Sequence, residues 1–435
     1  MKIPCCDGIT RRDALHVGLL GGVGLSLSNL LRLEAANLEA AKKGRAATAD
    51  SVLFINLAGG PSHLDTLDMK PDVPAETRGE FQPIPSKLTG LAVCEHLPRF
   101  AAVADRFTLI RGISHTAGAH PLGQSWISTG NRPTPALIYP SFGSVVSKER
   151  PTKPDLPPYV AIPKTEWNAG YMGDAYAPFK TNAVPKPGRP FQVRGISLAR
   201  GVTAETVTRR QKLLEKVDRR FRETETDSQL LDALDKFGKQ AYQMITSKRA
   251  RAAFDVTQEP KSIRKLFGPD EFSQSLLLGC RLIEFGVRFV TVTNQGWDTH
   301  LNNFRGHKKL LGPLDAGLPA MLEMLRSKGL LKRTLVVVMG EFGRTPKINA
   351  NTGRDHYPRV NWSLMTGGGI RPGQLVGGTN KAGTAPDDAT DIKPDDLAAT
   401  LYHVLGIDPR TEYQTKTGRP AMLVPEGRVI TKLFA

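Results

Sequence analysis

The feature of this chain that most restricts its fold is a series of short, almost entirely apolar segments separated by helical patterns. Such segments occupy residues 51–57, 287–293, 334–339 and 362–366, and a further one covers 107–110. A strand that is apolar on both faces is typical of a parallel sheet covered by helices. The alternation therefore predicts an α/β fold, in which helices cover both faces of a mostly parallel central sheet.

Helical patterns fill the intervals between the later strands. Residues 273–285 and 308–325 carry apolar side chains at helical spacing. A last helix is expected to begin at Asp396, whose side chain would cap its first turn. Two segments interrupt the alternation: a mostly irregular excursion rich in Pro and Gly at 131–190, and a charged helical insertion at 203–250.

The N-terminal segment has the layout of an export signal. Arg11 and Arg12 precede an apolar run from Val17 to Leu31, and small residues follow. This order predicts a twin-arginine signal peptide and linker over residues 1–49, and hence an exported, for example periplasmic, protein that meets the twin-arginine export machinery. The run is short for a membrane span, so no transmembrane segment is expected in the mature protein. The alternative is a core helix with two surface arginines.

The charge of the chain favours anionic partners. Lysine and arginine number 59 against 42 aspartates and glutamates, a formal net charge of +17, and most of this excess lies after residue 49. Sulfated or phosphorylated polymers would suit such a surface, although a solvated surface without a specific partner explains the charge equally well. Nucleic acid is an unlikely partner, because the sequence has no zinc finger, recognition-helix pattern or clustered basic arm.

Polar side chains recur in the loops that follow four of the predicted strands. Six of the nine histidines lie in these loops. The carboxyl ends of parallel strands share one edge of a sheet, so these side chains can converge there. A mixed set of histidines and carboxylates suits a divalent metal, zinc or manganese rather than calcium. The predicted metal ligands are His63, Asp65, Asp298, His300, His307, Glu341 and His356.

The same loops contain candidate catalytic residues. Ser114, Thr116 or His120 could act as a nucleophile, and Arg344 or Arg111 could hold an anionic group. His120 has a second interpretation, as a residue that caps the helix after it. The chain has neither a phosphate-binding Gly-Lys-Ser/Thr loop nor a Gly-x-Ser-x-Gly elbow, which argues against a P-loop protein and an α/β-hydrolase.

Several motifs resemble those of a known family. The segments GEFGRTP at 340–346 and GRDHYP at 353–358 are similar to domain-of-unknown-function family 1501, as are stretches at 54–71, 111–131, 294–307 and 396–409. The resemblance covers nearly all of the chain from about residue 50. It implies an exported bacterial protein whose residues 50–435 form one domain of the sulfatase and alkaline phosphatase superfamily.

The chain departs from the sulfatase pattern at two points. Gly59-Gly60 stands where sulfatases carry paired aspartates, and His120 stands at the nucleophile position when the chain is aligned on Thr129-Gly130. No cysteine is present there to become formylglycine. Two functions remain open besides other metal chemistry, such as a lyase or mutase. One is an exported metal-dependent hydrolase of sulfate or phosphate esters, acting on an anionic small molecule or polysaccharide. The other is a non-catalytic metal-binding relative that binds acidic glycans or takes part in surface assembly.

Overall fold

The structure, a computed structural model, describes residues 46–196, 203, 205–210, 212–213, 241–415 and 417–434. The chain divides into two units, Met1–Ala47 and Thr48–Ala435, and the fold below is that of the second. Nearly all of the predicted signal peptide lies outside the described residues, as does most of the predicted helical insertion. Among the described residues, no helix combines the length and apolar character needed to cross a membrane.

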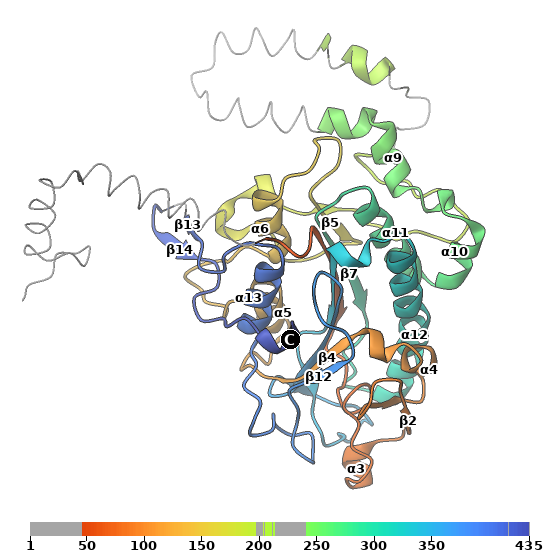
Figure 1. Cartoon of the computed structure of the whole chain (residues 1–435), viewed down its shortest axis with the longest axis vertical. Helices are drawn as coiled ribbons and strands as arrows, with labels where there is room; N and C mark the ends of the chain where they lie inside the picture. The colour runs from red at the N-terminus through yellow and green to blue at the C-terminus, as the bar shows by residue number, and fades with distance from the viewer. Residues whose placement is uncertain are drawn as a thin grey trace, which may run out of the picture. The chain divides into compact units, whose positions relative to one another are not determined.

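The centre of the unit is an eight-stranded sheet (Figure 1). In spatial order its strands are β12 (Gln374–Val376), β4 (Thr108–Ile113), β11 (Asn361–Thr366), β8 (Thr334–Met339), β1 (Ser51–Ala58), β7 (Phe289–Gln295), β5 (Tyr159–Ile162) and β6 (Phe179–Lys180). Within this described sheet β11 is antiparallel to both of its neighbours, and the other neighbouring pairs are parallel. The prediction of a mostly parallel α/β sheet is confirmed.

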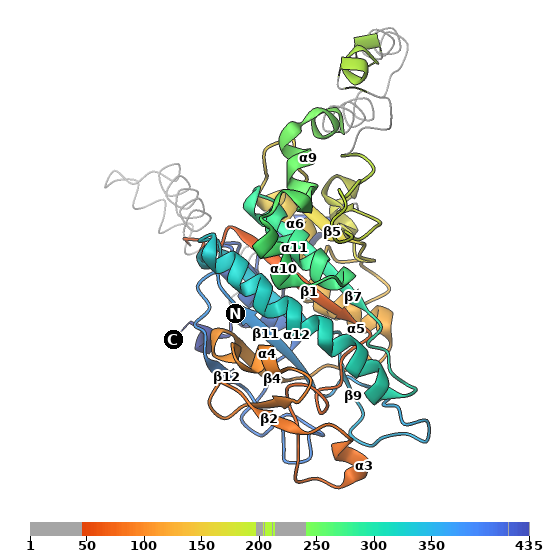
Figure 2. The same cartoon turned by 90° about the vertical axis from the view of Figure 1, so that its right-hand side faces the viewer.

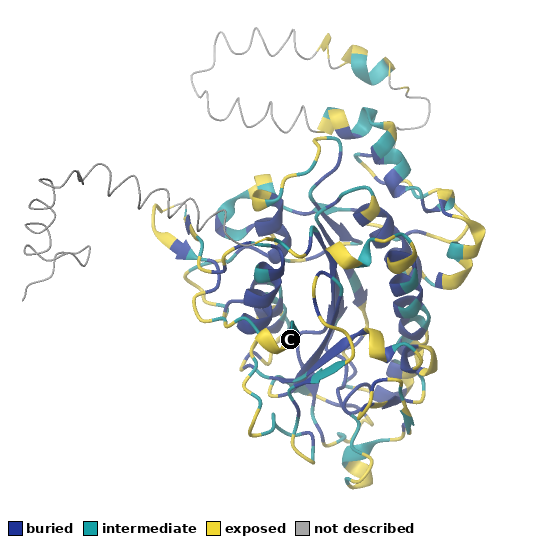
Figure 3. Cartoon of the chain, viewed as in Figure 1, coloured by how far each residue is buried: buried dark blue, intermediate teal, exposed yellow. Residues whose placement is uncertain are grey.

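Helices cover both faces of the sheet (Figure 1, Figure 2). One face carries α11 (Glu271–Glu284) and α12 (Asn303–Ser327), and the other carries α5 (His120–Thr129), α6 (Phe142–Glu149) and α13 (Pro394–Val404). Alternate side chains of β1 enter the two cores: Leu53 and Ile55 pack with the first set of helices, and Val52 and Phe54 with the second. The sheet and the inner faces of these helices are buried (Figure 3). Burial on both sides explains why the strands are almost entirely apolar.

Helices α12 and α13 begin earlier than their apolar patterns predict. Helix α12 starts at Asn303 rather than residue 308, because its polar first turn is held by buried contacts instead of an apolar stripe. Helix α13 starts at Pro394, so Asp396 lies in the first turn and not at the cap position. Its carboxylate still takes part in capping, since it accepts a hydrogen bond of 3.0 Å from the backbone N–H of Lys393.

The excursion at 131–190 is more ordered than predicted. It contains α6 and also β5, which joins the central sheet beside β7, with the short β6 at the edge. Other α-helices are α3 (Ala75–Arg78), α4 (Pro98–Ala101), α9 (Lys248–Phe254) and α10 (Lys261–Phe267). Two-stranded sheets are formed by β2 (Pro83–Pro85) with β3 (Ala92–Cys94), β9 (Gly343–Arg344) with β10 (His356–Tyr357), and β13 (Glu412–Gln414) with β14 (Pro420–Met422).

Candidate metal centre

Loops from four places in the chain meet at one edge of the sheet. The loop after β7 carries Asp298 and His300, and Glu341 follows β8. The loop after β4 leads to His120, the first residue of α5. His356 reaches the same edge on β10, which lies just before the antiparallel strand β11 and pairs with β9. The parallel topology thus brings together residues that are more than 200 positions apart in the sequence.

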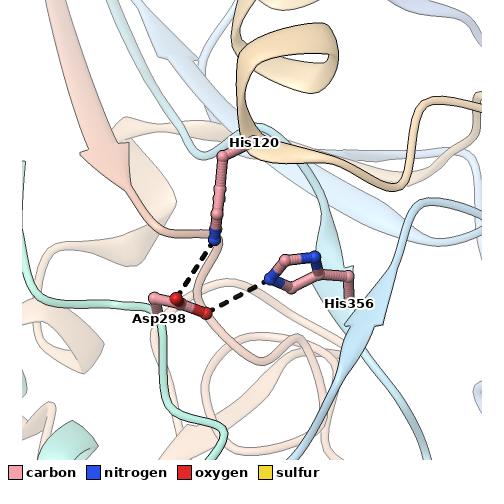
Figure 4. Close-up of side chains that lie close together, drawn as sticks. All are labelled: His120, Asp298 and His356. Carbon is pink, nitrogen blue, oxygen red and sulfur yellow. Dashed lines mark hydrogen bonds and ion pairs between the residues drawn. The ribbon is translucent and has the colours of Figure 1, made fainter.

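Three histidine rings surround the carboxylate of Asp298. Figure 4 shows two of them, His120 and His356, pointing at its oxygens. The Nε2 atoms of His120 and His356 each lie 3.2 Å from one carboxylate oxygen, and Nε2 of His300 lies 3.1 Å from Oδ1. The Nε2 atoms of His300 and His356 are 3.0 Å apart. The ligand atoms of His120, Asp298 and His356 all lie within 4.8 Å of one another, and His300 adjoins this group through its contacts with Asp298 and His356.

The far nitrogen of each of these rings faces an oxygen acceptor. The acceptors are Oε1 of Glu341 for His120 (2.6 Å), Oδ1 of Asp355 for His300 (2.6 Å) and the carbonyl oxygen of Gly118 for His356 (2.7 Å). A carbonyl only accepts, so Nδ1 of His356 must carry the hydrogen, and its Nε2 presents a lone pair to Asp298 when the ring is neutral. The rings of His120 and His300 each lie between two carboxylates, so either nitrogen can donate. An acceptor behind each imidazole is the usual support of a metal ligand.

The electrostatics of the centre favour an ionised Asp298. Burial opposes its charge, but the hydrogen bond and positive charge of Arg344 outweigh burial and set the pKa of Asp298 at about 2. The hydrogen bond to Glu341 raises the pKa of His120 above its ordinary value, against the effect of burial. Burial lowers the pKa of His356. The four side chains thus include one carboxylate that is negative at every physiological pH.

Arg344, which the sequence suggested as an anion-binding residue, has its guanidinium occupied by protein groups. Its side chain is fully buried, and its guanidinium donates to Oδ1 of Asp298 at 2.7 Å. It also donates to the carbonyls of Gly59, Gly60, Trp297 and Arg354. Arg344 therefore ties together the loops that present the ligands, and it orients Asp298 from behind.

Glu341 was predicted as a metal ligand, but the structure gives it a supporting place. Its carboxylate is fully buried. Its Oε2 accepts a hydrogen bond of 2.7 Å from the amide of Gln124, Oε1 contacts His120, and both oxygens accept from the backbone N–H of Gly59. Gly59 must be glycine here, since its φ is +115° and a Cβ would lie 2.3 Å from the backbone nitrogen of Asp298.

Asp65 is a second correction to the predicted ligand set. It is completely buried and forms a two-pronged ion pair with Arg354, with oxygen–nitrogen distances of 2.7 and 3.0 Å. It also accepts a hydrogen bond of 2.8 Å from the amide of Asn303. Both oxygens are used by these partners, so Asp65 stabilises the loops around the centre instead of facing it.

Two predicted histidine ligands are also buried elsewhere. Nε2 of His307 accepts from the backbone N–H of Ser62 at 2.9 Å, while Nδ1 donates to the carbonyl of Asn303 at 3.1 Å. Burial lowers the pKa of His307 to about 4, so the ring is neutral. His63 donates from Nε2 to the carbonyl of Gly383 at 2.9 Å, and burial lowers its pKa. Both nitrogens of His307 and Nε2 of His63 are thus used by backbone groups, and neither ring contacts Asp298 in the described structure.

The predicted nucleophiles Ser114 and Thr116 do not join the cluster. Both lie between the end of β4 and α5, and Thr116 is exposed. Neither side chain makes a hydrogen bond to another residue in the described part of the chain. His120 is the only one of the three predicted nucleophiles that faces Asp298 in the residues described.

A pocket of about 280 Å³ opens beside the cluster. His120, Gln124, Asp298 and Glu341 line one side. The residues that complete it are Asn56, Ala58, Gly59, Pro121, Lys164, Thr165, Glu166, Trp167, Thr293 and Gln295. Residues 164–167 follow β5, inside the stretch that was predicted to be mostly irregular, and no sequence motif identified them.

Replacement of Glu341 by glutamine is expected to weaken zinc binding about 10- to 100-fold, the usual effect of losing a residue that supports a metal-binding histidine. Both carboxylate oxygens of Glu341 accept hydrogen bonds, whereas glutamine has one oxygen and an NH₂ group that only donates. Glutamine therefore cannot accept from His120, Gln124 and Gly59 together. Competition with a chromophoric chelator measures the affinity, and the exposed Glu80→Gln is the matched control. Equal affinity in Glu341→Gln and Glu80→Gln would show that Glu341 does not orient His120.

Comparison with known proteins identifies a family but no curated relative. A search among curated proteins found no match. Solved structures match only distantly. One is the lipoteichoic acid synthase LtaP from Listeria monocytogenes, at 10% identity over 89% of this chain and 80% of that chain, with a TM-score of 0.37. Another is the PsFucS1 sulfatase from Pseudoalteromonas sp., at 12% identity over 92% and 74%, with a TM-score of 0.36.

A third match is TAB5 alkaline phosphatase in a mutant form with bound magnesium, at 11% identity over 84% of this chain and 100% of that chain, with a TM-score of 0.34. At these scores the likeness carries no argument about the site, and the α/β assignment depends on the sheet itself. The sequence comparison is decisive, because one family model spans residues 49–434. The chain belongs to the family described as "Protein of unknown function (DUF1501)".

Proposed function

We propose that this protein is a metal-dependent hydrolase of sulfate or phosphate esters that holds a divalent ion, zinc or manganese, between His120, Asp298, His300 and His356. One observation carries the proposal: three imidazole Nε2 atoms lie 3.1–3.2 Å from the oxygens of Asp298, and each ring is supported at Nδ1 by an oxygen. Three nitrogens and one carboxylate suit zinc or manganese better than calcium, which prefers oxygen ligands.

The centre is accessible to a substrate. The side chains of His120, Asp298 and His300 are 32%, 44% and 41% exposed, unlike the fully buried Glu341 behind them. His120 and Asp298 also line the pocket of about 280 Å³. A divalent ion in such an open site polarises an ester oxygen and lowers the pKa of a bound water. The protein residues fix the ligand directions, and the pocket orients the ester.

A second candidate function is a non-catalytic metal-binding relative that binds acidic glycans or takes part in surface assembly. It is favoured by the absence of any serine, threonine or cysteine from the four-residue cluster of the described structure. The cluster therefore contains no hydroxyl or thiol nucleophile, although attack by water does not require one.

The test that separates the two candidates is metal analysis followed by an activity screen. Purified protein is expected to contain zinc or manganese, and the zinc- and manganese-loaded forms are expected to hydrolyse 4-nitrophenyl sulfate, 4-nitrophenyl phosphate or bis(4-nitrophenyl) phosphate. Removal of the metal with a chelator should abolish this activity, and re-addition should restore it. Stable metal binding without hydrolysis of any of these esters would favour the binding protein over the hydrolase.

The affinity for metal is expected to fall as pH decreases through a value above 6.5, the ordinary pKa of histidine. A ligating histidine must be neutral, and the hydrogen bond to Glu341 raises the pKa of His120, so protons already compete with the metal near neutral pH. In the metal-free protein, the contribution of His120 to folding stability has the opposite pH dependence. Protonated His120 is stabilised by Glu341, so this contribution is complete below the unfolded pKa and is lost as pH rises through the folded pKa.

Melting curves of the two forms test this pH dependence. Between pH 6.5 and the raised pKa of His120, lower pH should stabilise the metal-free protein and reduce the extra stability that added zinc provides. His120→Gln should remove the part of both trends that belongs to this residue. Parallel pH profiles with and without zinc would contradict the assignment of His120.

We also propose that the protein acts outside the cytoplasm after export by the twin-arginine machinery. Arg11, Arg12 and the apolar run after them support this, and they lie outside the described residues. Conversion of both arginines to lysine keeps the charge but is expected to leave the precursor in the cytoplasm, because the receptor distinguishes the side chains. Fractionation of cells detects the precursor, and normal export of the double variant would contradict the proposal.

A further inference from the structure

We infer that the pocket beside the metal centre binds a group with a single negative charge, such as a sulfate monoester or a phosphodiester, and that Lys164 pairs with it. The inference deepens the proposed function and depends on it for the presence of a divalent ion. It excludes dianionic phosphate monoesters as preferred substrates. Three observations carry it: the charge balance at the centre, the position of Lys164, and the burial of Arg344.

The charges around the centre are balanced by one divalent cation. Asp298, Glu341 and Asp355 contribute three negative charges within the hydrogen-bonded network of the three histidines. Arg344 is the one positively charged partner that the structure describes for this network. The remaining excess of two negative charges equals the charge of a single zinc or manganese ion. With one such ion the formal charge of this network would sum to zero, so a further anion needs a cationic side chain outside the network to balance it.

Lys164 is the one cationic side chain among the residues that line the pocket, apart from His120. Its backbone is attached to the sheet, because its carbonyl oxygen accepts a hydrogen bond of 3.0 Å from the hydroxyl of Thr293 on β7. Its side chain is exposed and makes no hydrogen bond or ion pair with any residue that the structure describes. A fixed backbone with an unpaired ammonium group provides one positive charge for a ligand.

Among the residues that line the pocket in the described structure, there is no second lysine or arginine to bind a dianion. The guanidinium of Arg344 is fully buried and already occupied by Asp298 and backbone carbonyls. Glu166 also lines the pocket and repels additional negative charge. A phosphate monoester carries between one and a half and two charges near neutral pH, since its second pKa is about 6. A sulfate monoester or a phosphodiester carries one, which Lys164 can match.

The first test measures binding without turnover. Benzenesulfonate is a monoanion, and phenylphosphonate is mainly a dianion at about pH 8.5. Titration calorimetry on the zinc-loaded full-length protein is expected to show at least about tenfold tighter binding of benzenesulfonate. Lys164→Gln should remove most of this binding, whereas Lys153→Gln, an exposed lysine outside the pocket, should leave it unchanged. Tighter binding of phenylphosphonate by the unmodified protein would overturn the inference.

A gain of binding provides a second test. Glu166→Lys exchanges a repelling charge in the pocket for a second cation, so it should strengthen the binding of phenylphosphonate about tenfold or more, relative to benzenesulfonate. The variant changes an exposed residue and should fold normally. An unchanged preference in Glu166→Lys would contradict the charge argument even if Lys164→Gln behaves as expected.

Turnover measurements distinguish the two classes of monoanionic substrate, sulfate monoesters and phosphodiesters. Cleavage of 4-nitrophenyl sulfate identifies a sulfate ester, and cleavage of bis(4-nitrophenyl) phosphate identifies a phosphodiester. Equal or faster cleavage of 4-nitrophenyl phosphate would overturn the inference and leave the hydrolase standing. Hydrolysis of 4-nitrophenyl acetate alone would overturn both. If no ester is cleaved but benzenesulfonate binding still requires Lys164, the hydrolase proposal fails and the monoanion site is upheld.

Discussion

Replacement of Asp298 by asparagine is expected to lower the affinity for zinc by more than about 100-fold, beyond the effect of losing a supporting residue. Asp298 is the one negatively charged member of the four-residue cluster, and its oxygens lie 3.1–3.2 Å from all three Nε2 atoms. Asparagine keeps the shape and can still accept a hydrogen bond from Arg344 through its oxygen. Its NH₂ group would then take the place of Oδ2, point at Nε2 of His120 and remove the negative charge from the cluster.

The effect on zinc should be seen in two independent measurements. Chelator competition gives the affinity, and the increase of melting temperature on adding zinc shows whether the ion binds the folded state. Asp298→Asn should lose both, whereas Asp72→Asn, an exposed aspartate away from the centre, should retain both. Zinc affinity within a few-fold of the unmodified protein would remove Asp298 from the metal centre, whatever the effect on stability.

The sequence predicts the edge of the sheet where the centre lies. Continuous apolar runs identify the buried strands in the sequence, and polar residues that follow parallel strands meet at one edge of the sheet. This reasoning correctly brings Asp298 and His300 from the loop after β7 to the same place as Glu341 after β8. His356 was also expected there, although it arrives just before an antiparallel strand and not after a parallel one.

The sequence does not distinguish ligands from buried structural residues of the same type. His300 and His307 lie seven positions apart, yet His300 faces Asp298 while both nitrogens of His307 are used by backbone groups. The difference arises because α12 starts at Asn303 and carries His307 into the core. The backbone N–H that contacts Nε2 of His307 belongs to Ser62, far away in the sequence, so the local order of residue types does not reveal this contact.

The wall of the pocket was not predicted for a related reason. Lys164 and Trp167 follow β5, a strand of four residues inside a segment rich in Pro and Gly. Short strands give little periodicity, so this segment seemed irregular. Its place beside β7 is set by pairing with the sheet, which brings Lys164 next to the pocket.

Replacement of Asp65 by alanine is expected to reduce the free energy of unfolding by about 3–5 kcal/mol, because it leaves the charge of Arg354 buried without its partner. Both side chains are fully buried, and the guanidinium would retain only backbone carbonyls as acceptors. Denaturant unfolding measures the loss. The exposed pair of Asp391 and Arg428 is the control, since Asp391→Ala should change stability little.

The same variant also tests whether Asp65 is a metal ligand or a structural residue. If Asp65 stabilises the loops without facing the centre, the folded fraction of the variant should bind zinc with nearly normal affinity, in contrast to Asp298→Asn. A double variant, Asp65→Leu with Arg354→Met, removes both charges and should lose less stability than the sum of the single variants, because neither ion is left unpaired. Additive losses, or a loss of zinc affinity as large as that of Asp298→Asn, would contradict the buried ion pair and return Asp65 to the metal centre.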